Sequence, residues 1–218
     1  STMAPQLAIF DFDDTLYRGQ SFDKYIKFVY ERERNFLRKL LYKLSKIFIH
    51  FTRFSSKNNK FILTRFMSGL PIERLQSLAE EFVTCDIQTR IIAPVYGYLQ
   101  NHLQKGDTVI VVSGGLEIYI QIFAKQHNLE YSIATKIIDN KGIFFSVGEE
   151  CLGQTKIDRL SLMVNINEFD IINSHVYSDH LSDLPLFEYF GNPHYVAHST
   201  ALIPDIVMKK NWDIIRYE

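Results

Sequence analysis

The stretch LAIFDFDDT, residues 7–15, decides the fold, because four apolar residues are followed at once by closely spaced acids. A short apolar run with such an end is typical of a buried parallel strand. In open α/β sheets, ligands bind at the carboxyl ends of the strands. Residues at i and i+2 of extended chain point the same way, so we expect Asp11 and Asp13 to share one site.

The rest of the chain alternates similar apolar runs with helical patterns. Further strands are predicted at 108–112, 131–134, 175–177 and 194–197, and helices at 92–104, 117–127 and 156–164. Residues 135–147 carry the turn sequence DNKG between apolar runs, which predicts a hairpin. This alternation predicts an α/β fold, with a Rossmann-like parallel sheet.

Residues 22–90 interrupt the alternation, because they show helical patterns and no clear strand. Pro71 is suited to begin a helix over 72–83. We therefore predict an all-helical domain at 18–90, inserted after the first strand, and a core domain formed by 1–17 and 91–218.

Composition excludes several classes of protein. The chain has 218 residues and a formal net charge of −1, which does not suit a generally basic nucleic-acid binder. Its two cysteines, Cys85 and Cys151, are too few for a disulfide framework. We see neither a signal peptide nor an apolar run long enough to span a membrane, so a cytoplasmic enzyme is expected.

The acid pair predicts a specific chemistry. Two close carboxylates repel, and their proximity favours a shared proton or a bound cation. An all-oxygen site suits Mg²⁺. One carboxylate can then attack phosphorus, and the other can protonate the leaving oxygen and later deprotonate a water. The alternative is that Asp11 and Asp13 only cap the strand end.

Three more polar clusters follow predicted strands or begin predicted helices. Ser113-Gly114-Gly115 offers a hydroxyl and backbone N–H groups to a phosphoryl group, or it is a simple helix cap. Lys156 begins a helix, where a bound phosphate would offset the unfavourable dipole, or it is a solvated lysine. The segment SDHLSD, residues 178–183, adds Asp179 and Asp183, unless Ser182 or Asp183 only caps a helix.

In this order the motifs DFDDT, SGG, CLGQTK and YSDHLSD resemble those of the haloacid dehalogenase superfamily. The Cys-x-Gly-x-x-Lys form and the helical insertion resemble its phosphoserine-phosphatase-like branch, subfamily IB. The resemblance implies that Asp11 is the nucleophile and Asp13 the general acid/base. It implies Asp11, Asp13 and Asp179 as the Mg²⁺ site, Ser113 and Lys156 as phosphoryl ligands, and Asp183 as a supporting residue. Thr15, Gln20, Gly114 and Ser182 complete the expected phosphate- and substrate-binding set.

Two positions depart from phosphoserine phosphatases. Gln20 stands where those enzymes have a glutamate that meets the substrate ammonium, and Ser182 stands where they have an asparagine. An amide cannot form the full ion pair, which argues against phosphoserine. The expected function is hydrolysis of a small phosphomonoester. The alternatives are a phosphatidylglycerophosphate-type lipid phosphatase, a phosphotransferase with the same intermediate, a receiver module and a catalytically silent binding protein.

The segment 31–65 is strongly basic, with ten Lys or Arg against two acids. Within it, basic residues interleave with apolar residues that share one helical face: Phe36, Leu37, Leu40, Leu41, Leu44, Ile47, Phe48 and Phe51. Such a helix can lie on an anionic membrane, or its charges can steer an anionic substrate. We expect instead that the apolar face packs against neighbouring helices.

Overall fold

The computed structural model describes residues 4–52 and 56–218. It contains a six-stranded parallel sheet in the order β3-β2-β1-β6-β7-β8. The strands are β1 (Leu7–Phe10), β2 (Thr108–Leu116), β3 (Tyr131–Thr135), β6 (His175–Ser178), β7 (Asn192–His198) and β8 (Asp213–Tyr217). This is the order of a Rossmann-like sheet, so the predicted fold class is confirmed.

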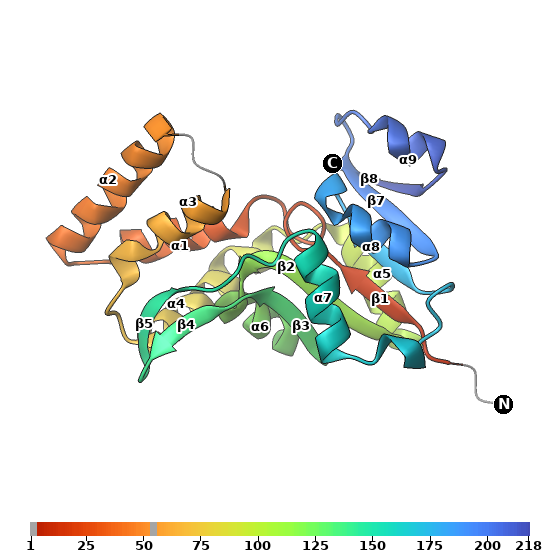
Figure 1. The fold of residues 1–218 in the computed structure, drawn as a ribbon, viewed down its shortest axis with the longest axis horizontal. Helices are drawn as coiled ribbons and strands as arrows, with labels where there is room; N and C mark the ends of the chain where they lie inside the picture. Colours follow the sequence, from red (N-terminus) through yellow and green to blue (C-terminus); the bar gives the residue numbers. More distant parts are fainter. Residues whose placement is uncertain (1–3, 53–55) are drawn as a thin grey trace.

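Alternate residues of β1 serve the two faces of this sheet. Ala8 and Phe10 belong to a buried cluster with α4 (Ile72–Cys85), α5 (Ala93–Gln104) and α6 (Glu117–Gln126). Leu7 and Ile9 belong to a second cluster with α7 (Gln154–Met163), α8 (Leu184–Tyr189) and α9 (Asp205–Lys209). Because β1 is buried on both faces, its sequence is continuously apolar rather than alternating (Figure 1).

The described residues between β1 and α5 are mainly helical. They form α1 (Ser21–Glu31), α2 (Phe36–Thr52), α3 (Ser56–Leu63), α4 and two short 3₁₀ turns, Arg65–Met67 and Ile87–Thr89. Helices α1, α2 and α3 extend to one side of the sheet (Figure 1). Residues of α1 and α4 join the same hydrophobic cluster as β1 and α6, so this part has no separate core. The division into domains at 18–90 remains a prediction.

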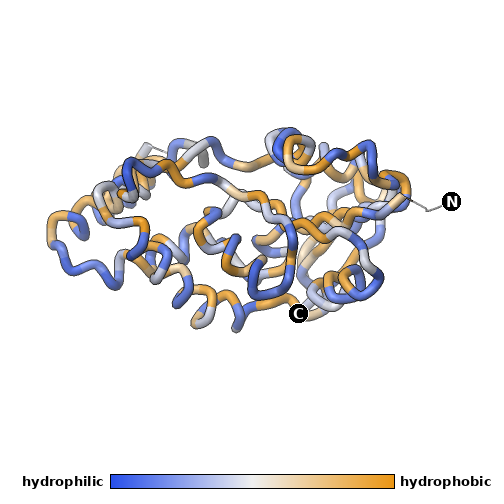
Figure 2. The backbone as a smooth tube through the Cα atoms, turned by 90° about the horizontal axis from the view of Figure 1, so that it is seen from below, coloured by the Kyte–Doolittle hydropathy of each residue, from blue (hydrophilic) through white to orange (hydrophobic). Residues whose placement is uncertain are grey.

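The apolar face of α2 does not pack as expected. The eight apolar residues predicted to share this face are between 40% and 79% exposed. Hydrophobic positions also occur along the backbone at the end of the molecule that lies away from the N-terminus, where Figure 1 places α2 (Figure 2). The prediction was wrong because α2 buries another face, through Tyr42 and Ser45, against α3 and the turn at Arg65–Met67. Among the described residues, no helix is long and apolar enough to cross a membrane.

The predicted hairpin is present as β4 (Ile137–Asn140) and β5 (Ile143–Val147). Lys141 and Gly142 form its two-residue turn with φ of 52° and 81°, as the strand twist requires. The hairpin also contacts the helical part, because the Phe144 N–H donates to the carbonyl of Leu70 at 2.8 Å. It therefore ties the segment before α4 to the core.

Two boundaries differ from the predictions. Strand β2 continues through Ser113-Gly114-Gly115 to Leu116, with an irregular register beside β3, so the glycines do not open the helix directly. Strand β8 was not predicted, because its sequence DIIRY is short, partly charged and lies at the sheet edge. The alternation that identifies buried strands is weak in such an edge strand.

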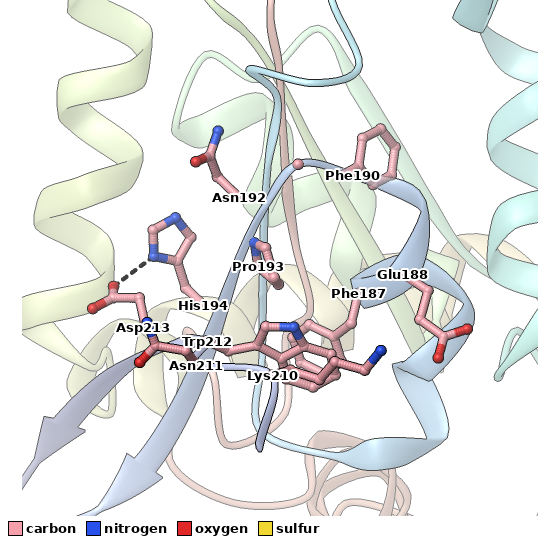
Figure 3. A pocket seen from close by; sticks show the side chains of 11 residues that line it. Phe187, Glu188, Phe190, Asn192, Pro193, His194, Lys210, Asn211, Trp212 and Asp213 are labelled. Atoms are coloured by element: carbon pink, nitrogen blue, oxygen red, sulfur yellow. Dashed lines mark hydrogen bonds and ion pairs between the residues drawn. The ribbon is translucent and has the colours of Figure 1, made fainter. Parts of the chain in front are cut away.

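Three histidine rings lie close together, away from the carboxyl ends of the strands of the sheet. His175 Nδ1 lies 2.8 Å from His194 Nε2, and His194 Nδ1 lies 2.6 Å from a carboxylate oxygen of Asp213. Figure 3 shows the second of these pairs at the edge of a hollow near the start of β7 and β8. The ring of His102 lies close to that of His175, with 4.7 Å between ring centroids and a tilt of 58°.

Burial, followed by the neighbouring His102 and His194, lowers the pKa of His175 from 6.5 to about 4. The unfolded chain therefore binds a proton at His175 between these values while the folded chain does not, so stability should fall as pH falls through this window. We predict that His175→Asn makes the urea midpoint less dependent on pH between about pH 7 and pH 5. An unchanged slope in the variant would contradict this role for His175.

Candidate active site

The site forms where the strand order reverses, between β1 and β6. The Asp11 N–H donates to the carbonyl of Tyr177 at 2.9 Å, which fixes Asp11 at the end of β1 beside the end of β6. The buried Thr15 hydroxyl lies 3.4 Å from Asp11 Oδ2 and 3.3 Å from Asp179 Oδ1. Asp11 and Asp179 therefore meet at this switch point, as the strand-end motifs predicted.

A tight loop after β1 keeps Asp13, the second acid of the motif, close to Asp11. The N–H groups of Thr15, Leu16 and Tyr17 all point at the carbonyl of Phe12, at 2.9 to 3.1 Å. Asp14 adopts φ of 55°, a conformation that aspartate tolerates better than most residues. Its carboxylate accepts the Gly19 N–H at 2.8 Å, which closes the loop.

Lys156 is the central cation of the site. Its Nζ lies 2.9 Å from Asp11 Oδ1 and 2.9 Å from Asp183 Oδ2, and the residue is only 2% exposed. Burial alone would lower the pKa of Lys156, but the two carboxylates raise it above its ordinary value. The ammonium therefore stays charged, so the interpretation of Lys156 as a solvated lysine is wrong.

Asp183 supports this arrangement from its own side. The Ser178 hydroxyl donates to Asp183 Oδ2 at 2.6 Å, and Asp183 makes no side-chain bond that caps α8. Asp183 Oδ1 is buried and has no hydrogen-bond partner among the described residues. Burial, followed by the charge of Asp11, raises the pKa of Asp183. This orphaned oxygen is suited to accept a bond from a water in the site.

Asp13 is held by residues that sequence reasoning missed. Its Oδ1 accepts the Ser21 N–H at 2.9 Å, and the Ser21 hydroxyl lies 2.7 Å from the Tyr119 hydroxyl. Burial raises the pKa of Asp13 to about 6, opposed by the bonds from Ser21 and reinforced by the charge of Asp11. A carboxyl group with such a pKa can both give and take a proton near neutral pH.

The carboxylates make the site strongly negative. Burial, followed by Asp11, raises the pKa of Asp179 well above its usual range. No three His, Cys, Asp or Glu side chains in residues 4–52 and 56–218 are grouped so that they alone hold a metal. Asp11 and Asp179 nevertheless offer two neighbouring carboxylates, which is the number that Mg²⁺ usually takes together with waters. The donor set therefore fits this ion.

The segment Ser113-Gly114-Gly115 is packed closely behind the acids. The Gly115 N–H donates to Ser113 Oγ at 2.9 Å, which orients this buried hydroxyl. A Cβ on Gly115 would lie 2.5 Å from the Tyr119 hydroxyl and 3.1 Å from Ser113 Oγ. Gly115 is thus required by close packing rather than by an unusual φ.

A cavity of about 840 Å³ joins these groups to the helical part of the chain. Its walls include the predicted residues Asp11, Asp13, Gln20, Gly114, Lys156, Asp179, Ser182 and Asp183. Thr15 and Ser113 are buried next to it. The Gln20 amide is bonded to Asp14 Oδ2 at 3.0 Å, while the Ser182 N–H donates to His180 Nδ1 at 2.9 Å.

Lys60 is a further residue that the sequence did not single out. It comes from α3, lines the cavity and donates to the carbonyl of Gly114 at 2.9 Å. It also forms an ion pair with Glu150, so it joins α3 to the core at the cavity wall. Only its place in a basic segment pointed to it, because helix periodicity does not show which lysine turns inward.

Comparisons with known proteins identify the family of the chain. A model of the haloacid dehalogenase-like hydrolase family matches residues 8–188. A probable phosphatase of Mycobacterium tuberculosis is 22% identical over 71% of this chain and 54% of its own length. An inhibition of morphological differentiation protein of Streptomyces azureus is 23% identical over 71% of this chain and 56% of its own. The chain thus spans about half the length of the curated relatives it matches.

Solved structures share the fold. A protein of unknown function from Bordetella pertussis Tohama I has a TM-score of 0.80 at 19% identity, covering 98% of this chain and 99% of its own. A phospho-aspartyl intermediate analogue of phosphoserine phosphatase has a TM-score of 0.63 at 19% identity, covering 98% and 93%. At these identities the likeness establishes the fold alone.

We predict that Gly115→Ala destabilises the protein by roughly 1–3 kcal/mol, because the new methyl group overlaps the Tyr119 hydroxyl. Tyr119→Phe should relieve part of this cost, so a double-mutant cycle measured by urea unfolding should be non-additive. Gly97→Ala is the control, since a Cβ there meets nothing within 4 Å inside α5. Additive costs in the cycle would show that the hydroxyl is not the obstacle.

Proposed function

The chain belongs to the haloacid dehalogenase-like hydrolases, and from this premise we propose that it is a Mg²⁺-dependent phosphatase acting through an aspartyl-phosphate on Asp11. The observation that carries the proposal is the placement of Asp11 at the switch point. Its Oδ1 is held by Lys156 at 2.9 Å, its Oδ2 lies 3.4 Å from the Thr15 hydroxyl, and the residue lines the same cavity as Asp13 and Asp179. A carboxylate held in this way is oriented for attack.

In the first step, an Asp11 oxygen forms a bond to phosphorus as the bond to the substrate oxygen breaks. Asp13 donates its proton to that leaving oxygen, which departs as an alcohol. In the second step, Asp13 takes a proton from a water, whose oxygen bonds to phosphorus and releases inorganic phosphate and Asp11. The pKa of Asp13 of about 6 suits this exchange of one proton in both directions.

The anionic phosphoryl group must be accepted among several carboxylates. Lys156 supplies the buried positive charge. The Ser113 hydroxyl and the Gly114 backbone lie towards the carboxyl end of β2, the strand beside β1. Asp11 and Asp179 would hold Mg²⁺ through their carboxylates, with the backbone carbonyl of Asp13. When bound, the ion would neutralise charge on the phosphoryl oxygens.

The substrate we propose is a phosphomonoester other than phosphoserine. In this structure the amide of Gln20 is bonded to Asp14, and it carries no charge to pair with an ammonium. The helical part instead contributes Lys46, Ile49 and Leu63 to the cavity wall. It also contributes Asp23 of α1 and Lys60, which is paired with Glu150. Such a wall favours an anionic group joined to an apolar body.

We predict that Asp11→Asn lowers Mg²⁺-dependent turnover of an aryl phosphate by roughly 10³-fold or more, because an amide cannot attack phosphorus. The measurement is release of the coloured phenol, with urea unfolding as the check that the variant folds. A hydroxylamine-sensitive phosphoenzyme should form in the parent protein and be missing in the variant. Unchanged turnover would overturn the mechanism. Transfer of phosphate to added alcohols in preference to water would assign a phosphotransferase instead.

A second prediction concerns the metal and needs no substrate. Mg²⁺ at about 100 times its Kd should stabilise the protein by about 2.7 kcal/mol, a rise in Tm of roughly 5–10 °C for a chain of this size. Asp179→Asn should remove most of this rise, because it takes away one of two carboxylates. His175→Asn, which lies outside the cavity, is the control. An equal rise in all three proteins would place the ion elsewhere.

A further inference from the structure

The exposed face of α2 is continuous. At 3.6 residues per turn, the apolar side chains fall within an arc of about 140°. The most exposed are Phe36 at 73%, Leu37 at 72% and Phe51 at 79%. Leu40, Leu41, Leu44 and Ile47 fill the same arc and are 40–53% exposed. We call these seven side chains the α2 stripe. A stripe of this width on a surface helix marks an interaction site rather than scattered exposure.

Positive charge borders the α2 stripe on one side. Helix α2 contains Arg38, Lys39, Lys43 and Lys46 and no Asp or Glu. Arg38 is turned inward to the carbonyls of Phe66 and Ser68, and Lys39 to the carbonyl of Tyr30. Lys43 and Lys46 are exposed. By helix geometry, Lys43 lies between the stripe and the side of α2 that faces the cavity, and Lys46 belongs to that cavity side.

The same helix forms a wall of the candidate active site. Lys46, Ile49 and His50 line the cavity that also contains Asp11 and Lys156. By helix geometry, His50 lies about 60° round α2 from Ile47 of the stripe, with Lys43 between them. The basic edge of the stripe therefore adjoins the cavity wall. This contiguity connects the docking surface to the phosphomonoester site.

We infer that the α2 stripe docks on an anionic lipid bilayer, and that the cavity takes a lipid phosphomonoester presented by that bilayer. The substrate part of this inference rests on the proposed phosphatase function. The chemistry favours a bilayer because an apolar face with a basic flank fits an apolar interior below anionic head groups. A second copy fits less well, since pairing two stripes would bring the two basic flanks together.

Docking is tested without any catalysis. Parent protein is sedimented with vesicles of phosphatidylcholine alone and of phosphatidylcholine with about 30 mol % phosphatidylglycerol. The variant Leu37→Gln/Leu44→Gln/Phe51→Gln removes the centre of the stripe. The control Leu162→Gln/Ile172→Gln/Leu202→Gln changes three residues of comparable exposure on the core. The expected result is at least about tenfold tighter binding to the anionic vesicles, lost in the stripe variant and kept in the control.

Three results would overturn docking on the bilayer. They are no preference of the parent protein for anionic vesicles, equal loss of binding in the stripe and control variants, and a dimer of the parent that the stripe variant turns into monomer. The last result would assign the stripe to a second copy. Light scattering during size exclusion measures it. Lys43→Gln provides an independent check, since it should weaken vesicle binding and leave the cavity intact.

Turnover separates this inference from the proposed function. The stripe variant should hydrolyse a soluble aryl phosphate at the parent rate and lose about tenfold in rate on a lysophosphatidic acid embedded in the anionic vesicles. Equal rates of parent and variant on the embedded lipid would show that the stripe does not deliver the substrate, and would overturn that part of the inference. No hydrolysis of the lipid by a parent protein that does hydrolyse the aryl phosphate would overturn the lipid substrate. Failure of the parent on both substrates would overturn the phosphatase function, while the vesicle binding stands by itself.

Discussion

The buried ammonium of Lys156 is the constraint on which the rest of the site depends. It pairs with Asp11 and Asp183 at the same time, with 2.9 Å to each, while the lysine itself is only 2% exposed. Removing one member of such a group leaves an uncompensated buried charge, which typically costs several kcal/mol. The lysine therefore holds α7 in register with the ends of β1 and β6. It also orients Asp11, the proposed nucleophile.

The parallel sheet explains why the main residues of the site could be predicted from sequence. Carboxyl ends of parallel strands meet at one edge of a sheet, so acids that follow apolar runs must converge there. Asp11, Asp13 and Asp179 were identifiable for that reason, and so was Lys156 at the start of α7. Their roles depend on position in the fold and on charge, both of which leave clear signals in a local stretch of sequence.

Other features left no such signal. Ser21 and Tyr119 are 98 residues apart, and only the packing of α1 on α6 brings their hydroxyls to 2.7 Å. The face of α2 was misjudged for a related reason. Periodicity identifies an apolar face, but the neighbours decide whether it is covered. Here Tyr42 and Ser45 are covered, while Arg38 and Lys39 use their hydrogen bonds on the protein side. β8 was missed because its edge sequence is short and mixed.

The cavity walls contributed by the core and by α2 and α3 carry charges of opposite sign. The core contributes the acids at its strand ends, while α2 and α3 contribute Lys46 and Lys60 on the facing wall. The phosphomonoester proposed above would be repelled by the acids alone, and a positive charge on the facing wall lowers that barrier and raises its local concentration. A helix that supplies this charge on one side and leaves its apolar side uncovered is suited to draw the anion from a lipid surface.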